Sequence, residues 1–275
     1  MKRRAQPWLG TLVEISIADA FCEPKLNQAF AQAFAQIAEV HRLMSFHSPH
    51  SDVARINAAA AGCAVTISPH TMSVLQIALQ LTDATASVFN INCGSQLARW
   101  AMLPSTDANL PPYAGDECSL HILDATTVRK TRPALIDLGG IAKGYAVDQA
   151  VAALEKNGIA SACVNAGGDL RVLGDLPFPI TIRDPQALGQ AGAQLDLSNA
   201  ALATSATYFS RRKFGGKTVS ALIDGRNGAA IMSERSVSVI APSCILADAL
   251  TKVVLASGDP NHAILADFNA TAFMI

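Results

Sequence analysis

The most constraining feature of this chain is a short apolar run that ends in an acid and is followed by two glycines and the start of a helix. The segment runs from Ile136 to Asp148 and reads IDLGGIAKGYAVD. Glycines let the backbone approach a ligand closely and adopt positive φ. A helix that begins just after them directs free N–H groups and a partial positive charge at the same place. With Asp137 and Lys143 beside it, the segment predicts a site for a phosphate-bearing ligand, with or without a metal.

The pattern alone leaves a plainer interpretation open, because many Gly-Gly turns between a strand and a helix bind nothing. The segment is not a GxxxxGK[ST] phosphate loop, since Lys143 precedes the last glycine and no Ser or Thr follows it, and it is not GxGxxG. A second pair, Gly167-Gly168, stands before Asp169. This pair is as compatible with a tight turn or a β-bulge as with backbone pressed against a ligand.

Composition and charge exclude several classes of protein. The chain has 275 residues, of which 50% are hydrophobic, and this suffices for one large domain or two intimate lobes. The net charge of −1 and the lack of a Lys/Arg-rich stripe argue against nucleic-acid binding. No apolar run is long enough to predict a membrane span. Because an alternating stretch with Glu14 follows the basic residues 2–4, we expect no export signal and a cytoplasmic location.

The hydrophobic periodicity predicts an α+β fold with two strand-rich halves that each carry helices. The expected strands lie at about 9–18, twice within 119–137, at 161–165 and 170–173, and through most of 180–240. The expected helices lie at about 25–44, at 52–56 with Ser51 or Asp52 as the cap, at 69–86, at 97–100, from the Gly-Gly turn to 157, and at 247–257. A loop or short strand is expected at 87–92 and a loop at 103–118. Asp248 is expected in the first turn of the last helix, on the same face as Lys252. A simple ion pair between these two side chains is the alternative to a functional role.

Seven short motifs, taken in order, resemble those of the ApbE-type flavin transferases, the FAD:protein FMN transferases. Each motif is weak alone, and their order along nearly the whole chain carries the resemblance. They are 9–11 (LGT), 44–57 (MSFH and SDVARIN), 137–148, 165–169 (NAGGD), 203–205 (ATS), 223–228 (IDGRNG), and 241–250 (APS and ADAL).

The resemblance implies a single domain over 1–275, with an ApbE-like, T-fold-related architecture of two intimate lobes and a cleft between them. It also implies FAD as substrate and Mg²⁺ as cofactor. Such proteins cleave FAD, attach FMN through a phosphoester to a Thr or Ser of a target flavoprotein, and release AMP. A phosphoryl transfer of this kind depends mainly on positioning and on neutralisation of charge, which a metal that bridges phosphate oxygens supplies.

Carried over to this chain, the resemblance assigns three groups of residues. Those expected to bind FAD are Leu9, His47, Val88, Phe89, Asn90, Asp137, Lys143, Leu222 and Ile223. Those expected to hold Mg²⁺ are the Gly140 carbonyl, Asp248 and Thr251. Those expected to assist the acceptor hydroxyl are Ser205, Asp224 and Asp248.

The chain departs from the family pattern at positions that bear on catalysis. Lys252 stands where the family has a Thr that binds the metal, and Ala221 stands where it has a His. The alternatives are that Lys252 places its own positive charge beside the diphosphate, or that a shifted Thr251 supplies the oxygen to the metal. His47 replaces a Tyr, and Asn90 replaces an Asp. Two alternatives therefore stay beside the transferase: a non-catalytic FAD-binding or flavin-delivery protein, and a Mg²⁺-dependent FAD pyrophosphatase that yields FMN and AMP.

Overall fold

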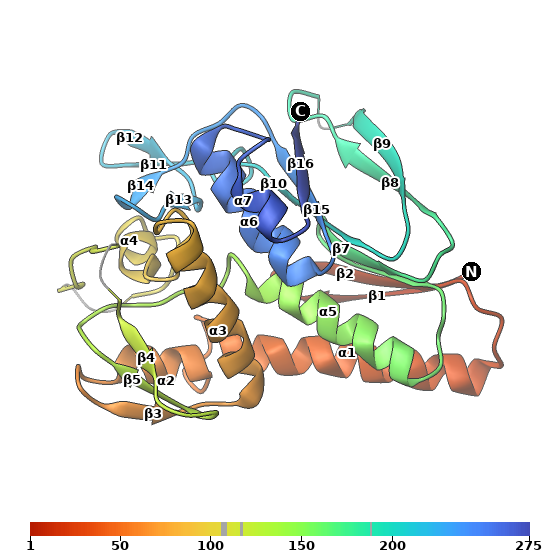
Figure 1. The fold of residues 1–275 in the computed structure, drawn as a ribbon, viewed down its shortest axis with the longest axis horizontal. Coiled ribbons are helices and arrows are strands. Elements are labelled where there is room, and N and C mark those ends of the chain that lie inside the picture. The colour runs from red at the N-terminus through yellow and green to blue at the C-terminus, as the bar shows by residue number, and fades with distance from the viewer. Residues whose placement is uncertain (106–108, 116–117, 188) are drawn as a thin grey trace. The chain divides into compact units, whose positions relative to one another are not determined.

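The computed structural model describes residues 1–105, 109–115, 118–187 and 189–275 and contains two compact units (Figure 1). Unit 1 comprises 1–41, 141–206 and 234–275, and unit 2 comprises 42–140 and 207–233. Both units combine helices with antiparallel strands, which confirms the α+β class. The single domain over 1–275 and the cleft between lobes stay predictions.

Unit 1 is built on a seven-stranded sheet in which every neighbouring pair is antiparallel. The strands in spatial order are β1 (Lys2–Trp8), β2 (Thr11–Ile17), β6 (Ala162–Ala166), β7 (Asp169–Leu173), β10 (Ala201–Ser205), β15 (Val237–Ala241) and β16 (Thr271–Met274). Its helices are α1 (Glu23–Met44), which ends in unit 2, α5 (Ala142–Lys156), α6 (Cys244–Ser257) and α7 (Ile264–Asp267).

The first hairpin corrects the prediction of a single strand at 9–18. Leu9 and Gly10, with φ of 56° and 73°, form the turn between β1 and β2, and Trp8 pairs with Thr11. The basic residues 2–4 are therefore strand residues. Because most of β1 is exposed, it has no alternation of apolar and polar residues from which sequence could predict a strand.

The two faces of the sheet of unit 1 carry different layers, because side chains alternate along each strand. One face packs through Leu170, Val172 and Leu202 against the hairpin of β8 (Phe178–Arg183) and β9 (Ala191–Leu197). The opposite face, which carries Asp169 and Arg171, packs against α5 and α6 (Figure 1).

The described residues of unit 2 form three helices and small antiparallel sheets. The helices are α2 (Asp52–Ala58), α3 (Pro69–Ala84) and α4 (Gly94–Arg99). The strands are β3 (Ala64–Thr66), β5 (Thr127–Lys130) and β4 (Leu120–Ile122) in one sheet, and the pairs β11 (Arg212–Phe214) with β12 (Lys217–Val219) and β13 (Ile223–Asp224) with β14 (Ala229–Ala230). The predicted cap of α2 is confirmed, since Ser51 Oγ accepts from Ala54 N–H at 3.0 Å.

Two loop predictions have different outcomes. Residues 87–92, expected to form a loop or a short strand, form a loop. The predicted loop at 103–118 lies in part outside the described residues, which omit 106–108 and 116–117. Within the described part of the chain, no helix is both long and apolar enough to cross a membrane.

Helix α6 begins at Cys244, earlier than predicted, so Asp248 lies in the second turn and not in the first. The cap comes from another helix. Asp148 of α5 accepts from the backbone N–H groups of Cys244 and Ile245, both at 2.9 Å. A carboxylate there satisfies two of the N–H groups that the helix itself leaves unpaired. Because the partners lie 96 and 97 residues apart, a local capping pattern could not predict this start.

Gly144 allows α5 to pack closely on the start of α6. A Cβ at Gly144 would lie 2.8 Å from Ile245 Cα and would overlap the Cys244 carbonyl. Both of these atoms belong to backbone, which cannot move aside as a flexible side chain can. The close approach brings Asp148 within reach of the α6 N-terminus.

We predict that Gly144→Ala destabilises the protein by about 1–3 kcal/mol through overpacking. Propensity alone predicts the opposite sign, because Ala favours a helix over Gly by about 1 kcal/mol. Urea denaturation measures the change. Gly189→Ala is the control, since a Cβ there meets nothing within 4 Å. A stabilised Gly144→Ala variant would show that the contact between α5 and α6 is not tight.

Candidate functional site

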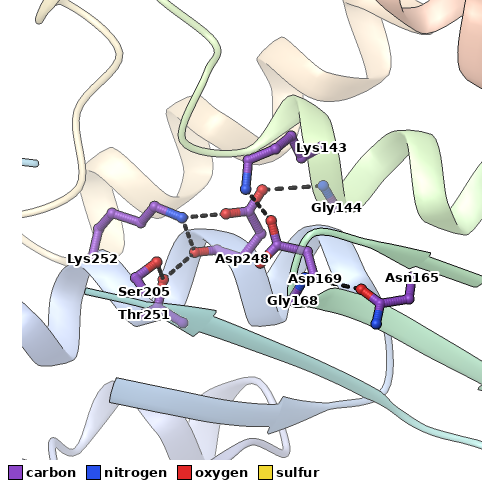
Figure 2. Close-up of polar contacts among 9 residues, drawn as sticks. All are labelled: Lys143, Gly144, Asn165, Gly168, Asp169, Ser205, Asp248, Thr251 and Lys252. Atoms are coloured by element: carbon purple, nitrogen blue, oxygen red, sulfur yellow. Dashed lines mark hydrogen bonds and ion pairs between the residues drawn. The ribbon is translucent and has the colours of Figure 1, made fainter. Parts of the chain in front are cut away.

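Four charged side chains meet on the helix-covered face of the sheet in unit 1 (Figure 2). Lys143 Nζ pairs with Asp169 Oδ2, and Lys252 Nζ pairs with Asp248 Oδ1. The carboxylate side chains are buried, at 1% and 0% exposed, whereas the side chain of Lys143 is 33% exposed and that of Lys252 is 11% exposed. We call these four residues the charge cluster. Its two positive and two negative charges cancel.

The local geometry of each element explains why these residues meet. Asp169 pairs with Ala203 across β7 and β10, so Ser205, two residues further along β10, lies on the same face of the sheet. On α6, Asp248, Thr251 and Lys252 are spaced i, i+3 and i+4 and therefore share one face of the helix. The expected ion pair between Asp248 and Lys252 is present, and the functional roles of the two residues stay predictions.

The Gly167-Gly168 pair forms a tight turn between β6 and β7. Its φ angles are 68° and 106°, which a residue with a side chain rarely adopts, and Asn165 Oδ1 accepts from Gly168 N–H at 2.9 Å. The turn places Asp169 at the start of β7, opposite Lys143 (Figure 2). The motif therefore forms a tight turn, and contact of its backbone with a ligand stays a prediction. In the first pair, neither Gly139 nor Gly140 has a positive φ.

The start of α5 directs one of its N–H groups at a carboxylate of the protein itself. Gly144 N–H donates to Asp248 Oδ2 at 3.1 Å. The partial positive charge of a helix N-terminus favours an anion at this position. The anion is a side chain of α6, so this N–H group, which the sequence assigns to a phosphate, already has a partner within the fold.

Burial and neighbouring charge shift the pKa values in the cluster. Burial raises the pKa of Asp169 and the nearby Asp248 carboxylate raises it further, although Lys143 and Lys252 act against this. For Lys143, burial lowers the pKa, but the charges of Asp169 and Asp248 outweigh that effect and the net shift is upward. Lys143 is therefore a fixed positive charge at neutral pH.

A chain of hydroxyl groups extends from Asp248 toward β10. Thr251 Oγ1 donates to the Asp248 carbonyl at 2.6 Å and also lies 2.7 Å from Ser205 Oγ. A hydroxyl has one hydrogen. Since that of Thr251 goes to Asp248, Ser205 is the donor in the second bond.

The oxygens expected to bind Mg²⁺ do not fit a resident divalent cation. Asp248 Oδ1 accepts from Lys252, and its Oδ2 accepts from Gly144 N–H. Lys252 Nζ also donates to the Asp248 carbonyl at 2.7 Å. An ammonium therefore stands where the metal would have to bind. The described residues also contain no group of three or more His, Cys, Asp or Glu side chains that could hold a metal ion. Gly140, the third expected ligand, lies two residues before the start of α5.

In unit 2, hydrogen bonds join two of the segments expected to bind FAD. Gly225 N–H donates to the Val88 carbonyl at 3.0 Å, and the Tyr113 hydroxyl donates to the Gly225 carbonyl. Asn90 Nδ2 donates to the Gly115 carbonyl. The segment 88–90 thus lies beside the turn that follows β13.

The side chains expected to contact FAD differ in exposure. Phe89 and Ile223 are buried, and Ile223 packs in an apolar cluster with Leu97 and Trp100. Leu222 is half-buried, and its carbonyl accepts from Ile231 N–H at 2.8 Å. His47 is exposed. Leu9 is half-buried and belongs to the β1–β2 turn of unit 1.

Two acids of unit 2 were expected to have roles in the site, Asp137 and Asp224, and their pKa values shift in opposite directions. Burial raises the pKa of Asp137 from 3.8 to about 6, although the Gly139 N–H group and the charge of His47 lower it. Asp224 bonds Arg226 at 2.7 Å and 3.0 Å, and these hydrogen bonds lower the pKa of Asp224. A lowered pKa makes Asp224 a weak proton acceptor.

Sequence reasoning missed the structural role of Asp148. This residue caps α6 and bonds Arg171 of β7 at 2.8 Å, so it holds two helices and the sheet together. Asp148 is the last residue of the glycine-containing motif, and its position in that motif was the only signal available.

Comparison with known proteins identifies the family. The chain matches the ApbE family over residues 9–275 and belongs to it. An FAD:protein FMN transferase of Rhodobacter capsulatus is 32% identical over 268 residues, which are 91% of this chain and 50% of that protein. One of Vibrio cholerae is 27% identical over 249 residues, 85% of this chain and 74% of that protein. This chain thus spans about half the length of the first relative.

Solved structures confirm the ApbE-like fold. The ApbE protein of Thermotoga maritima has a TM-score of 0.85 at 24% identity, with 100% of this chain and 94% of that chain covered. The flavinyl transferase ApbE of Pseudomonas stutzeri, in its apo form, has a TM-score of 0.83 at 22% identity, with coverages of 99% and 90%.

We predict a specific effect of pH on stability at Asp137. The raised pKa means that the folded state holds the proton of Asp137 more tightly than the unfolded state does. The contribution of Asp137 to the free energy of unfolding is therefore complete below about pH 4 and is lost as the pH rises to about 6. The loss is about 2–3 kcal/mol for a shift of this size. Asp137→Asn should remove it.

Urea denaturation of both proteins at several pH values between 4 and 7 tests this prediction. The difference in the free energy of unfolding between wild type and Asp137→Asn should change across that range. Asp259→Asn, at an exposed position, is the control variant. A difference that is independent of pH would mean that Asp137 titrates as an ordinary carboxyl group.

Proposed function

We propose that this protein transfers the FMN part of FAD to a Thr or Ser hydroxyl of a target flavoprotein and releases AMP. The observation that carries the proposal is the match to the ApbE family over 9–275, together with relatives named FAD:protein FMN transferase. In this reaction the acceptor oxygen forms a bond to the FMN phosphorus, and the bond from that phosphorus to the bridging oxygen breaks. The hydroxyl proton leaves to solvent, and AMP carries away the bridging oxygen.

The charge cluster supports this chemistry through its lysines. Phosphoryl transfer needs positioning and charge neutralisation more than covalent participation by the protein. Lys143 and Lys252 supply two ammonium groups, each paired with a buried carboxylate. We infer that these lysines hold the diphosphate of FAD, with Lys143, the more exposed of the two, as the main contact.

We assign binding roles in unit 2 according to exposure. Val88, Phe89 and Asn90 offer backbone and amide contacts to FAD, because the Phe89 ring is buried and is not free to stack. Asp137 is a candidate for a polar group of FAD. Leu222 is half-buried and is a candidate for an apolar contact with FAD.

Exposure and packing also separate the other three residues expected to bind FAD. Ile223 is a supporting residue below the surface, because it packs in an apolar cluster. His47, which is exposed, and Leu9 are the candidates for contact with the flavin ring.

The three catalytic candidates differ in what they can do. Asp248 is engaged by Lys252 and Gly144 N–H, so we propose that it positions the ammonium and does not accept a proton. Asp224 is a weak base because Arg226 lowers its pKa. Ser205 keeps its oxygen lone pairs, since it acts as the donor to Thr251, and is our candidate for contact with the acceptor hydroxyl.

The pairing of Asp224 with Arg226 and the methyl side chain of Ala221 favour a second candidate, a protein that binds FAD without cleaving it. The third is a pyrophosphatase in which water takes the place of the acceptor hydroxyl. All three predict binding of FAD and differ in their products.

Product analysis separates the three functions. The protein is incubated with FAD and a flavoprotein acceptor, with Mg²⁺ and separately with EDTA, and the products are resolved by chromatography and mass spectrometry. We expect AMP in equal amount to FMN attached to the acceptor, and no adduct on an acceptor whose Thr or Ser is replaced by Ala. Free FMN with AMP indicates the pyrophosphatase. Intact FAD after incubation with a competent acceptor contradicts both enzymes.

We predict that Lys143→Met weakens FAD binding by about tenfold or more, because a charge-assisted hydrogen bond contributes about 1.5–3 kcal/mol. Flavin fluorescence measures the affinity. Lys156→Met is the matched control, since Lys156 is exposed at the far end of the same helix. Equal affinities of the two variants would remove Lys143 from the binding site.

A further inference from the structure

We propose that Lys252 is a built-in cation that takes the place of a divalent metal in this protein. On this proposal, which rests on the proposed function, the diphosphate of FAD is bound by the ammonium groups of Lys252 and Lys143 without Mg²⁺. On this proposal, Lys252 determines that an ammonium group and not a divalent metal ion neutralises the diphosphate. This role is separate from the cleavage of FAD.

The first argument is geometric. Lys252 Nζ contacts both the carbonyl and the Oδ1 oxygen of Asp248, one turn earlier on α6. Asp248 and Thr251 are the side chains that the sequence assigned to the metal. Thr251 Oγ1 donates to the Asp248 carbonyl at 2.6 Å, and one of its two lone pairs accepts from Ser205 Oγ. A metal ion at Asp248 Oδ1 would displace Lys252 or lie beside its positive charge, and the two cations would repel each other.

The second argument is charge balance. Without Lys252, the cluster would hold one ammonium, from Lys143, and two buried carboxylates, from Asp169 and Asp248. Such a site would have a net negative charge and would require a further cation before it could accept a diphosphate. Lys252 makes the cluster neutral, so a metal is no longer needed to offset Asp248 (Figure 2).

The third argument is the direction in which the charges face. The carboxylate side chains are 1% and 0% exposed, whereas those of Lys143 and Lys252 are 33% and 11% exposed. The lysines are therefore the more exposed members of the cluster, Lys143 far more so than Lys252, which is a buried residue. An ammonium has three N–H donors. Within the described part of the chain, Lys252 Nζ uses two of them on Asp248 and Lys143 Nζ uses one on Asp169, which leaves donors for phosphate oxygens.

Direct metal titration tests the proposal without any flavin. Mn²⁺ serves as the probe and is followed by electron paramagnetic resonance. We expect no stoichiometric Mn²⁺ site in the wild-type protein and one site in Lys252→Thr, where a hydroxyl replaces the ammonium. The double variant Asp248→Asn/Lys252→Thr should lose that site again. A stoichiometric Mn²⁺ site in the wild type that disappears in Asp248→Asn would overturn the proposal.

FAD binding in EDTA and in Mg²⁺ gives the second measurement. The wild type should bind FAD with the same affinity, within about twofold, in both buffers. Lys252→Met should bind at least tenfold more weakly in EDTA, as expected for loss of a charge-assisted hydrogen bond. Wild-type affinity that rises tenfold or more with Mg²⁺ also overturns the proposal.

The two measurements separate failure of this proposal from failure of the proposed function. Absence of FAD binding in either buffer contradicts the function, and the Mn²⁺ titration then decides the role of Lys252 alone. If Lys252→Met does not fold because it leaves Asp248 buried and unpaired, Asp248→Asn/Lys252→Met removes both charges of the pair and is used in its place. Lys156→Met is again the control and should match the wild type in both measurements.

Discussion

The close packing of α5 on α6 is the constraint on which the rest of unit 1 depends. Gly144 leaves no side chain between the two helices, so the α6 backbone approaches α5 directly. Two contacts follow from this approach: Asp148 caps α6 and Gly144 N–H reaches Asp248. Each helix start therefore receives a carboxylate from the other helix. The same arrangement fixes where Lys252 can place its ammonium.

Burial explains why the cluster has to contain both signs of charge. A carboxylate that is removed from water without a partner is costly, and breaking one member of a buried pair leaves an uncompensated charge. Asp169 and Asp248 are almost completely buried and each has its own lysine. We interpret the lysines as serving two purposes, since they neutralise the acids below them and offer donors to an anion above them. The chain belongs to the ApbE family, and our proposal of a distinct use of cations rests on Lys252.

Much of the fold could be predicted from the chain alone. Strong helical periodicity predicted α1 and α3 closely, and Ser51 predicted the start of α2. The predictions were wrong where no local signal exists. Strand β1 is largely exposed and has no apolar alternation, and the start of α6 depends on Asp148, 96 residues away. The same division holds for the candidate site, where the motifs pointed to Lys143, Asp169 and Asp248 but not to how these residues pair.

The sequence by itself determined the α+β class, the family resemblance and the residues able to carry charge, because periodicity and motif order are properties of the chain. Only the tertiary structure decided which charges neutralise one another. Asp248 could have bound a metal, capped its own helix or paired with Lys252. It pairs with Lys252 and accepts from Gly144 N–H. The physical reason is that partner choice depends on distance and burial, which arise when segments far apart in the sequence pack together.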